Sequence, residues 1–394
     1  MKAFAFLILC LGLVALADAA TTSAPPCGWP MKVTGKGMSN VFFPDTDATY
    51  WVMPVDTTQW QSLTLQGKYT DSRFFSFTTY YNLQHPSPNV VDDIIDIDIS
   101  PDAGSTNPFQ HPQITAPGIP RAYTITFDAN SSGTGNHVQW AAGQTTYVVY
   151  RIYVPDRGLK RRAGAPLPQL TLVDNDGNQQ ALARCPAGNS ELSSFITAVE
   201  SSSTAPPPMT CPASQPQSPQ ITFTPNTGGG GGIFGNPVTT YVAARNLCIS
   251  SGQIAVLRGK APDFPDTYNG STIYQPALLP GPIQLRYWSM CNNKEELPRP
   301  VTGCKADFDT VLDAQRFYTY VTSTDTSRPT WLPPEIGWIP WGDPTIQNAL
   351  LFRDMLPADG FTLSGPYIPI GAFCDQQTFV SGGWQACFAA AQGQ

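Results

Sequence analysis

The chain has 394 residues, and its 22 basic and 29 acidic side chains give a formal net charge of −7. This acidic balance, without an evident basic block, argues against nucleic acid or an anionic membrane as the partner. Only 13% of residues are charged and 72 are Gly or Pro (33 plus 39), yet 41% are hydrophobic, so the composition predicts a turn-rich, folded chain and excludes disorder.

The N-terminal residues 1–19 predict export. Lys2 precedes the apolar run AFAFLILCLGLVALA, and the small-residue site Ala17-Asp18-Ala19 follows it. This order is typical of a cleaved secretory signal peptide, and no later stretch reaches the roughly 18 apolar residues of a spanning helix. We therefore expect a secreted protein without a transmembrane segment. The sequons at Asn130 and Asn269 would make it a glycoprotein in a eukaryotic host.

Cysteine usage agrees with export. Once Cys10 leaves with the signal peptide, eight cysteines remain, and an even number in an exported chain predicts four disulfides. A zinc site is disfavoured because there is no C-x-x-C and only three histidines are present. Local spacing favours the pairs Cys185 with Cys211, Cys291 with Cys304, and Cys374 with Cys387, which leaves Cys27 with Cys248 to bridge the two halves.

Residues 20–204 are predicted to form a first β-sandwich domain. β-Branched or aromatic residues alternate with polar ones in several short segments that Gly, Pro, Asn and Asp interrupt, which is typical of an all-β, jelly-roll-like sandwich. The sequence DNDGN at 174–178 predicts a hairpin turn, and residues 189–202 predict one short helix. The expected strands lie in residues 61–69, 73–81, 122–129, 145–154 and 168–183.

The composition changes at residues 205–237, which are rich in Pro and Gly and predict a linker. The glycine run 228–232 has no following Lys-Ser/Thr, so it does not indicate a phosphate-binding loop. Residues 238–394 are then expected to form a second β-sandwich domain.

The second half repeats the first, because five short motifs recur in the same order. Such a repeat predicts two tandem sandwiches with one strand order, in which Arg73 is equivalent to Arg286 and Arg151 to Arg353. We expect these arginines to be structural, buried against aromatic rings and bonded to a carboxylate or carbonyl. The matching pairs are TYWV at 49 and TYVA at 240, LQGKYTDS at 65 and LRGKAPDF at 257, RFFS at 73 and RYWS at 286, YTITF at 123 and YTYVT at 318, and VVYRIYVP at 148 and LLFRDMLP at 350.

Features that occur in only one copy are better functional candidates than shared ones. In the first copy, Asp96 and Asp98 alternate with Ile along an expected strand, and Asp102 follows its exit. Their carboxylates could bind calcium or act as an acid/base pair. The alternative is a solvated strand face with an Asx turn at Asp102. Calcium is the only cofactor that the sequence suggests.

The second copy has a Pro-rich loop with Trp331, Trp338 and Trp341 beside Glu335 and Asp343. Exposed indoles on a rigid platform with a carboxylate rim suit stacking on sugar rings. The alternative is a loop folded over the sandwich edge with its tryptophans buried.

A third candidate is the segment that contains Arg258, Lys260 and Asp266, which could form a polar cleft between the domains beside the tryptophan loop. Together these features favour binding of carbohydrate or another extracellular surface polymer. Two alternatives stay open: a glycosidase-like hydrolase that uses Asp96, Asp98 or Asp266 as acid and base, and a structural coat or matrix protein.

Four motifs of the second half, VLRGKAPDFPDT at 256, LRYWSMC at 285, WIPWG at 338 and LLFRDMLP at 350, resemble those of a family of exported, functionally uncharacterised and mainly bacterial proteins. Two first-half motifs, SRFFSF at 72 and SPDAGSTNPF at 100, extend the resemblance. It implies a two-copy β architecture and supplies no activity and no catalytic residues.

Overall fold

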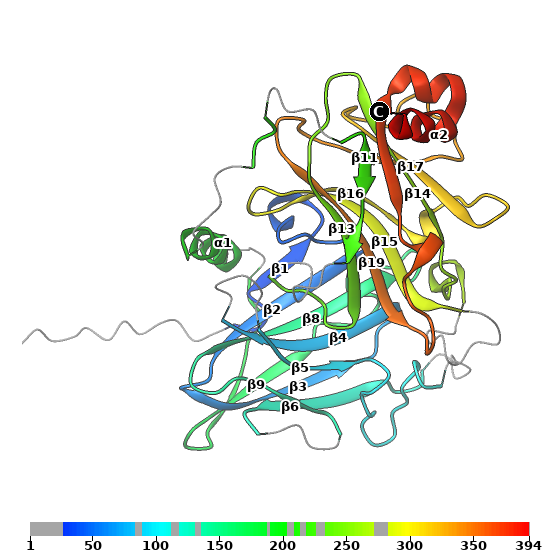
Figure 1. The fold of residues 1–394 in the computed structure, drawn as a ribbon. Coiled ribbons are helices and arrows are strands. Elements are labelled where there is room, and N and C mark those ends of the chain that lie inside the picture. The colour runs from blue at the N-terminus through cyan, green and yellow to red at the C-terminus, as the bar shows by residue number, and fades with distance from the viewer. Residues whose placement is uncertain are drawn as a thin grey trace, which may run out of the picture.

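The computed structural model shows an all-β protein with two stacked sandwich domains (Figure 1). The predicted signal peptide and the glycine run 228–232 lie outside the described residues. The structure describes residues 27–82, 89–111, 118–130, 135–186, 190–202, 209–212, 218–225, 233–271 and 283–393.

The first domain consists of two five-stranded sheets, and strands β2, β3 and β4 alternate between them as in a jelly roll. Between the sheets lies an aromatic-rich core that includes Phe75, Phe77 and Tyr150. In spatial order, one sheet contains β1 (Met31–Thr34), β2 (Ala48–Asp56), β8 (Thr145–Pro155), β4 (Ser72–Tyr81) and β5 (Asn89–Ile95). The other contains β10 (Gln179–Ala181), β9 (Gln169–Asp174), β3 (Trp60–Lys68), β6 (Ala122–Asp128) and β7 (His137–Gln139).

The second domain has the same plan, with its own core around Trp288, Tyr318 and Phe352. One of its sheets contains β12 (Thr224–Pro225), β13 (Thr239–Leu247), β19 (Asn348–Pro357), β15 (Leu285–Lys294) and β16 (Val301–Ala306). The other contains β11 (Gln220–Thr222), β20 (Ile370–Asp375), β14 (Gln253–Lys260), β17 (Phe317–Ser323) and β18 (Gly337–Pro340).

The predicted duplication extends to strand register. Arg151 on β8 lies opposite Tyr50 on β2 and Ser76 on β4. In the second domain, Arg353 on β19 lies opposite Tyr241 on β13 and Ser289 on β15. In the sheet that contains β3 and in the sheet that contains β14, one edge strand is parallel to its neighbour: β7 to β6 in the first domain and β18 to β17 in the second. Nine strands of each domain therefore correspond in order. The edge strands that pair with β9 and β20 do not, because β10 follows β9 in the chain whereas β11 precedes the rest of the second domain.

The shared Gly-Lys motif has a packing reason. A Cβ atom at Gly67 would lie 2.4 Å from the ring of Tyr123, and one at Gly259 would lie 2.4 Å from the hydroxyl of Tyr318. Each tyrosine stands directly opposite its glycine in the register. Both copies therefore need glycine so that a core tyrosine can lie across the strand.

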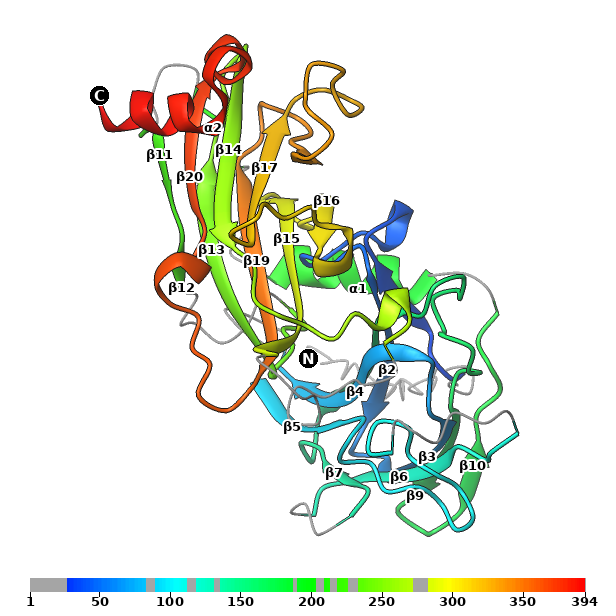
Figure 2. The ribbon, with the colours of Figure 1, turned by 90° about the vertical axis from the view of Figure 1, so that its right-hand side faces the viewer.

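Strands β4 and β15 are buried on both faces, since every residue of each strand except the last is buried. By contrast, β3 alternates between buried and more exposed residues because its outer face is open. The second face of β4 and β15 packs against the other domain, in a cluster that contains Phe74, Tyr153, Tyr287 and Met355. Figure 2 shows the sheets that contain β4 and β15 at the place where the two domains meet. The two sandwiches therefore share a hydrophobic interface.

Two helices accompany the strands. The predicted helix is confirmed as α1 (Ser190–Ser202), with Leu192 buried. A second helix, α2 (Gln376–Gln392), which the sequence reasoning did not predict, follows β20 at the C-terminal end. The segment 205–237, expected as a linker, contains the short strands β11 and β12, which pair with β20 and β13 of the second domain.

Four disulfides are present, but two of the predicted pairings are wrong. Cys291–Cys304 and Cys374–Cys387 are confirmed. The remaining bonds are Cys27–Cys185 and Cys211–Cys248, so neither Cys185–Cys211 nor Cys27–Cys248 forms. The reason is backbone pairing. A bridge from Gly28 to Arg184 brings Cys27 to Cys185, and a bridge from Thr210 to Ile346 fixes Cys211 to the second domain. Each disulfide therefore lies within one domain.

Candidate ligand-binding pocket

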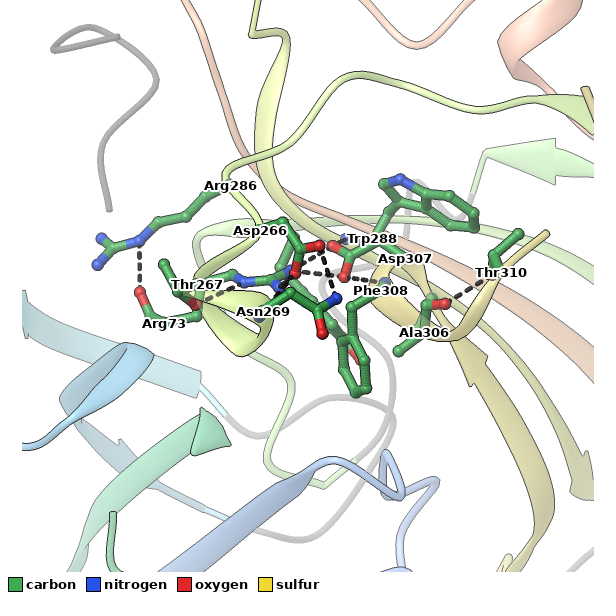
Figure 3. A network of polar contacts seen from close by, with 12 residues as sticks. Arg73, Asp266, Thr267, Asn269, Arg286, Trp288, Ala306, Asp307, Phe308 and Thr310 are labelled. Atoms are coloured by element: carbon green, nitrogen blue, oxygen red, sulfur yellow. Dashed lines mark hydrogen bonds and ion pairs between the residues drawn. The ribbon is translucent and has the colours of Figure 1, made fainter. Parts of the chain in front are cut away.

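The duplicated arginines form a crossed pair of buried ion pairs between the domains. Arg73 on β4 contacts Asp307 of the second domain at 2.5 Å, and Arg286 on β15 binds Asp96 of the first domain through two hydrogen bonds of 2.8 Å. All four side chains are fully buried. Figure 3 shows Arg73 beside Asp307 and the Arg286 Nε donating to the Arg73 carbonyl.

The two aspartates occupy equivalent positions. Each follows the edge strand of its sheet, β5 or β16, and each accepts a hydrogen bond from the backbone N–H of the neighbouring strand, at Phe75 or Trp288. Burial raises the pKa of both carboxyls, that of Asp307 to about 6, while the facing arginine acts in the opposite direction. The prediction that Arg73 and Arg286 are structural is confirmed, except that their carboxylates lie across the domain interface.

The second arginine pair repeats this crossing. The Nη2 of Arg151 donates to the carbonyl of Phe234 at 2.8 Å, and that of Arg353 donates to the carbonyl of Phe43 at 2.6 Å. Each arginine thus reaches a phenylalanine carbonyl of the other domain. The arginines of the RYWS and RFFS motifs likewise bind residues of the other domain.

The structure does not bring together the three aspartates of the predicted calcium site. The strand β5 ends at Ile95, and the chain turns at once, with the Asp98 N–H donating to the Ile95 carbonyl. Asp96 is ion-paired with Arg286, Asp98 is exposed, and Asp102 accepts a hydrogen bond from the Thr124 hydroxyl at 3.2 Å. In the described part of the chain, these three carboxylates do not form a cluster with metal-ligand spacing. The alternation of Asp and Ile therefore falls on a turn, where it does not place the carboxylates on one face.

The same observations argue against the predicted acid/base pair. Asp96 is inaccessible. Asp266 caps the turn 267–269 and lies 3.7 Å from Arg73 at the domain interface. The Lys260 ammonium lies 5.5 Å from the Tyr367 ring, and Arg258 lines a cavity that includes neither Lys260 nor Asp266. Arg258, Lys260 and Asp266 therefore do not form one cleft.

The three loop tryptophans also separate. Strand alternation sends Ile339 and then Trp341 into the core, where Trp341 is 0% exposed against Phe373, so it cannot stack on a ligand. Trp338 is partly buried on the outer face, and its indole N–H donates to the Ser323 hydroxyl at 3.0 Å. Of the three, Trp331 lines the cavity described next.

That cavity, of about 460 Å³, lies on the outer face of the sheet that contains β14 and β17. The side chains of Val256 and Val321 on this face are covered by α2 and the tryptophan loop. The outer pocket, as we call this cavity, is lined by Arg258, Thr319, Trp331, Glu335, Phe379 and Trp384, and by residues 311–313, 317, 333, 336, 380 and 383.

Arg258 is held at the base of the outer pocket. Its guanidinium carbon lies 4.2 Å from the Trp384 ring centroid, while its Nη2 pairs with Asp313 at 2.5 Å and its Nη1 donates to the Thr319 hydroxyl at 2.8 Å. On the wall, Trp331 meets Phe379 edge to face with 6.1 Å between centroids. Two indoles and a fixed cation therefore share one concave surface.

The outer pocket also carries acceptors. Asp313 retains 34% exposure of its side chain, and the exposed Glu335 makes no hydrogen bond to another described residue. Aromatic faces with a few fixed donors and acceptors suit ligands that combine apolar C–H faces with hydroxyl groups. The volume suits one or two sugar rings by the usual range of roughly 300–1,000 Å³ for small-ligand pockets.

The residues that α2 contributes to this pocket were not predicted from the sequence. Phe379 and Trp384 lie on α2, which kinks at Gly383 (φ 66°). A helical signal was present, since Phe379, Cys387 and Ala391 are buried at spacings of eight and four, as on one helix face. The Gly382-Gly383 pair interrupts the periodicity and conceals it.

The disulfide Cys374–Cys387 ties α2 to β20 beside the outer pocket, whereas Cys291–Cys304 joins adjacent strands elsewhere. Both close loops of the same sequence separation, 13 residues. We expect the double variants Cys374→Ala/Cys387→Ala and Cys291→Ala/Cys304→Ala to lose similar stability, roughly 3 kcal/mol. Only the first should speed amide hydrogen exchange in α2. Equal exchange of α2 in both variants would contradict the role of this bond in holding the pocket wall.

No protein-family model matches the chain, and no curated relative does. Among solved structures, an uncharacterized protein from Burkholderia cenocepacia is similar, with a TM-score of 0.53 and 12% identity over 88% of this chain and 82% of that chain. A protein from Vibrio parahaemolyticus has a TM-score of 0.40 and 9% identity over 84% of this chain and 90% of that one. The Burkholderia structure shows that this fold occurs elsewhere. Among the described residues, no helix is both long and apolar enough to cross a membrane.

Proposed function

We propose that the protein binds uncharged carbohydrate through the outer pocket, as an exported protein that recognises an extracellular polysaccharide or glycan. The observation that carries this is the convergence of Trp331, Trp384 and Arg258 with two carboxylates in one cavity. Four disulfides are compatible with export. The cation of the pocket belongs to the second copy, since Gln66 stands in place of Arg258 in the first.

The test is a glycan-array or polysaccharide pull-down screen, followed by titration of the best ligand. We expect Trp331→Ala and Trp384→Ala each to weaken binding at least tenfold, about 1.4 kcal/mol, because each removes a stacking surface. The matched control is Trp338→Phe, which changes a tryptophan of the same loop that does not line the pocket. Melting curves should show that all three variants remain folded.

Two results would refute the proposal. One is a bound glycan whose affinity is the same in the Trp331→Ala, Trp384→Ala and Trp338→Phe variants. The other is a complete absence of carbohydrate binding, which would favour the structural coat or matrix hypothesis.

A further inference from the structure

A second cavity, also of about 460 Å³, lies between the two domains. The second domain contributes Tyr268 and Phe308, and the first contributes four short segments, 34–36, 46–49, 154–155 and 159–162. We call it the interdomain pocket. Because the crossed ion pairs fix the domains against each other, both walls of the pocket are held in place.

The rim of the interdomain pocket is basic. The cations that line it are Lys36 and three residues of the segment RGLKRR at 157–162, and Arg157 of this segment lies over the Tyr268 ring. All five cations are exposed. Among the described residues, no carboxylate lies within ion-pair distance of Lys36, Arg157, Lys160, Arg161 or Arg162. Five cations without an acidic partner thus gather in a chain of net charge −7. The expectation that the chain lacks a basic block is wrong at this segment.

The basic rim belongs to one copy only. When Pro155 is matched to Pro357, as the repeat requires, Arg157 corresponds to Asp359 and Lys160 to Thr362. Arg161 and Arg162 correspond to Leu363 and Ser364. The shared architecture therefore does not need these cations, which makes a ligand-binding role more favourable than a structural one.

The interdomain pocket also has an aromatic side. Tyr268 stacks on Phe308 with 4.2 Å between ring centroids and 23° between planes, and the Arg157 guanidinium lies 5.5 Å from the Tyr268 ring. The one lining carboxylate is Asp47, whose pKa is raised to about 7 by burial, with a contribution from Asp45. It therefore opposes an anion less than an ordinary aspartate would at neutral pH.

We propose that the interdomain pocket binds an acidic saccharide, with the carboxylate or sulfate group on the basic rim and the sugar ring against Tyr268. Concavity and volume suit a single sugar residue better than a flat membrane surface. The acidic charge of the whole chain opposes the long-range attraction that nucleic acid binding uses. This site is separate from the outer pocket and does not depend on the function proposed for it.

The test compares polygalacturonate and dextran sulfate with neutral dextran by calorimetric titration at low and moderate salt. The variant Lys160→Gln/Arg162→Gln should bind the acidic polymers at least about tenfold more weakly. Its control, Lys68→Gln/Arg184→Gln, removes one exposed lysine and one exposed arginine away from the pocket and should change affinity less than about twofold. Tyr268→Ala should also weaken binding, whereas Trp331→Ala/Trp384→Ala should leave it unchanged.

Equal losses in the two double-charge variants would overturn the proposal, because net charge would then explain the binding. Single-stranded DNA or anionic vesicles that bind as tightly as the acidic polysaccharides would overturn it as well. Failure of the outer pocket to bind neutral glycans would leave these comparisons unaffected, so the two proposals fail separately.

Discussion

Arg286→Met is expected to destabilise the protein by about 3–5 kcal/mol, because it leaves the Asp96 carboxylate buried without its partner. Arg286 and Asp96 are both fully buried and joined by two 2.8 Å bonds. The pair links the two domains, so the loss should appear in urea unfolding as a lower midpoint for the whole molecule.

The double variant Arg286→Met/Asp96→Leu should recover much of this loss, since it removes the buried charge together with its partner. The control is Arg121→Met, whose ion pair with Asp71 is partly exposed, at 25% and 44%. We expect it to cost less than about 1 kcal/mol. If Arg286→Met costs no more than Arg121→Met, or if the double variant is no more stable than the single one, the buried pair is not what holds the interface.

Asp354→Asn is expected to stabilise the protein at pH 8. Asp354 on β19 is 1% exposed, and its Oδ1 makes no hydrogen bond within the described structure. The equivalent residue in the first domain is the core residue Ile152. Burial raises the pKa of Asp354 to about 7, and an aspartate perturbed from its ordinary value to that extent weakens the folded state by roughly 4 kcal/mol once it is ionised.

The direction of the pH dependence follows from proton binding. Between about pH 4 and pH 7 the folded state holds a proton on Asp354 that the unfolded state has lost, so this group makes stability fall as pH rises. The gain from Asp354→Asn should therefore be small near pH 4, grow up to about pH 7 and then level off. Asp354→Ile, which restores the residue of the first copy, should behave in the same way. The exposed Asp359→Asn serves as control, and a pH-independent gain would contradict the explanation.

The domain interface explains why the motif with the strongest chemical appearance is structural. Arg286 stands among Tyr287, Trp288 and Cys291, a combination that invites an active-site interpretation. Its recurrence as Arg73 pointed to architecture, and the structure adds the reason, namely that each arginine supplies the cation for an aspartate of the other domain. A duplicated fold with crossed contacts requires the same residue in both copies.

Local sequence signals are sufficient to predict the all-β class, the tandem repeat and the equivalence of the arginines. These depend on local alternation, turn residues and internal similarity, which act over short distances along the chain. Contacts between segments that lie far apart in the sequence could not be predicted from these signals. Cys27 finds Cys185 through a backbone bridge 158 residues away, and Asp96 meets an arginine 190 residues away. The end of β5 before Asp96 and the inward turn of Trp341 were decided by packing, since a shift of one residue in a strand exchanges its faces. The outer pocket exists only because α2, β14 and the tryptophan loop meet on one sheet face, a contact that only tertiary structure can create.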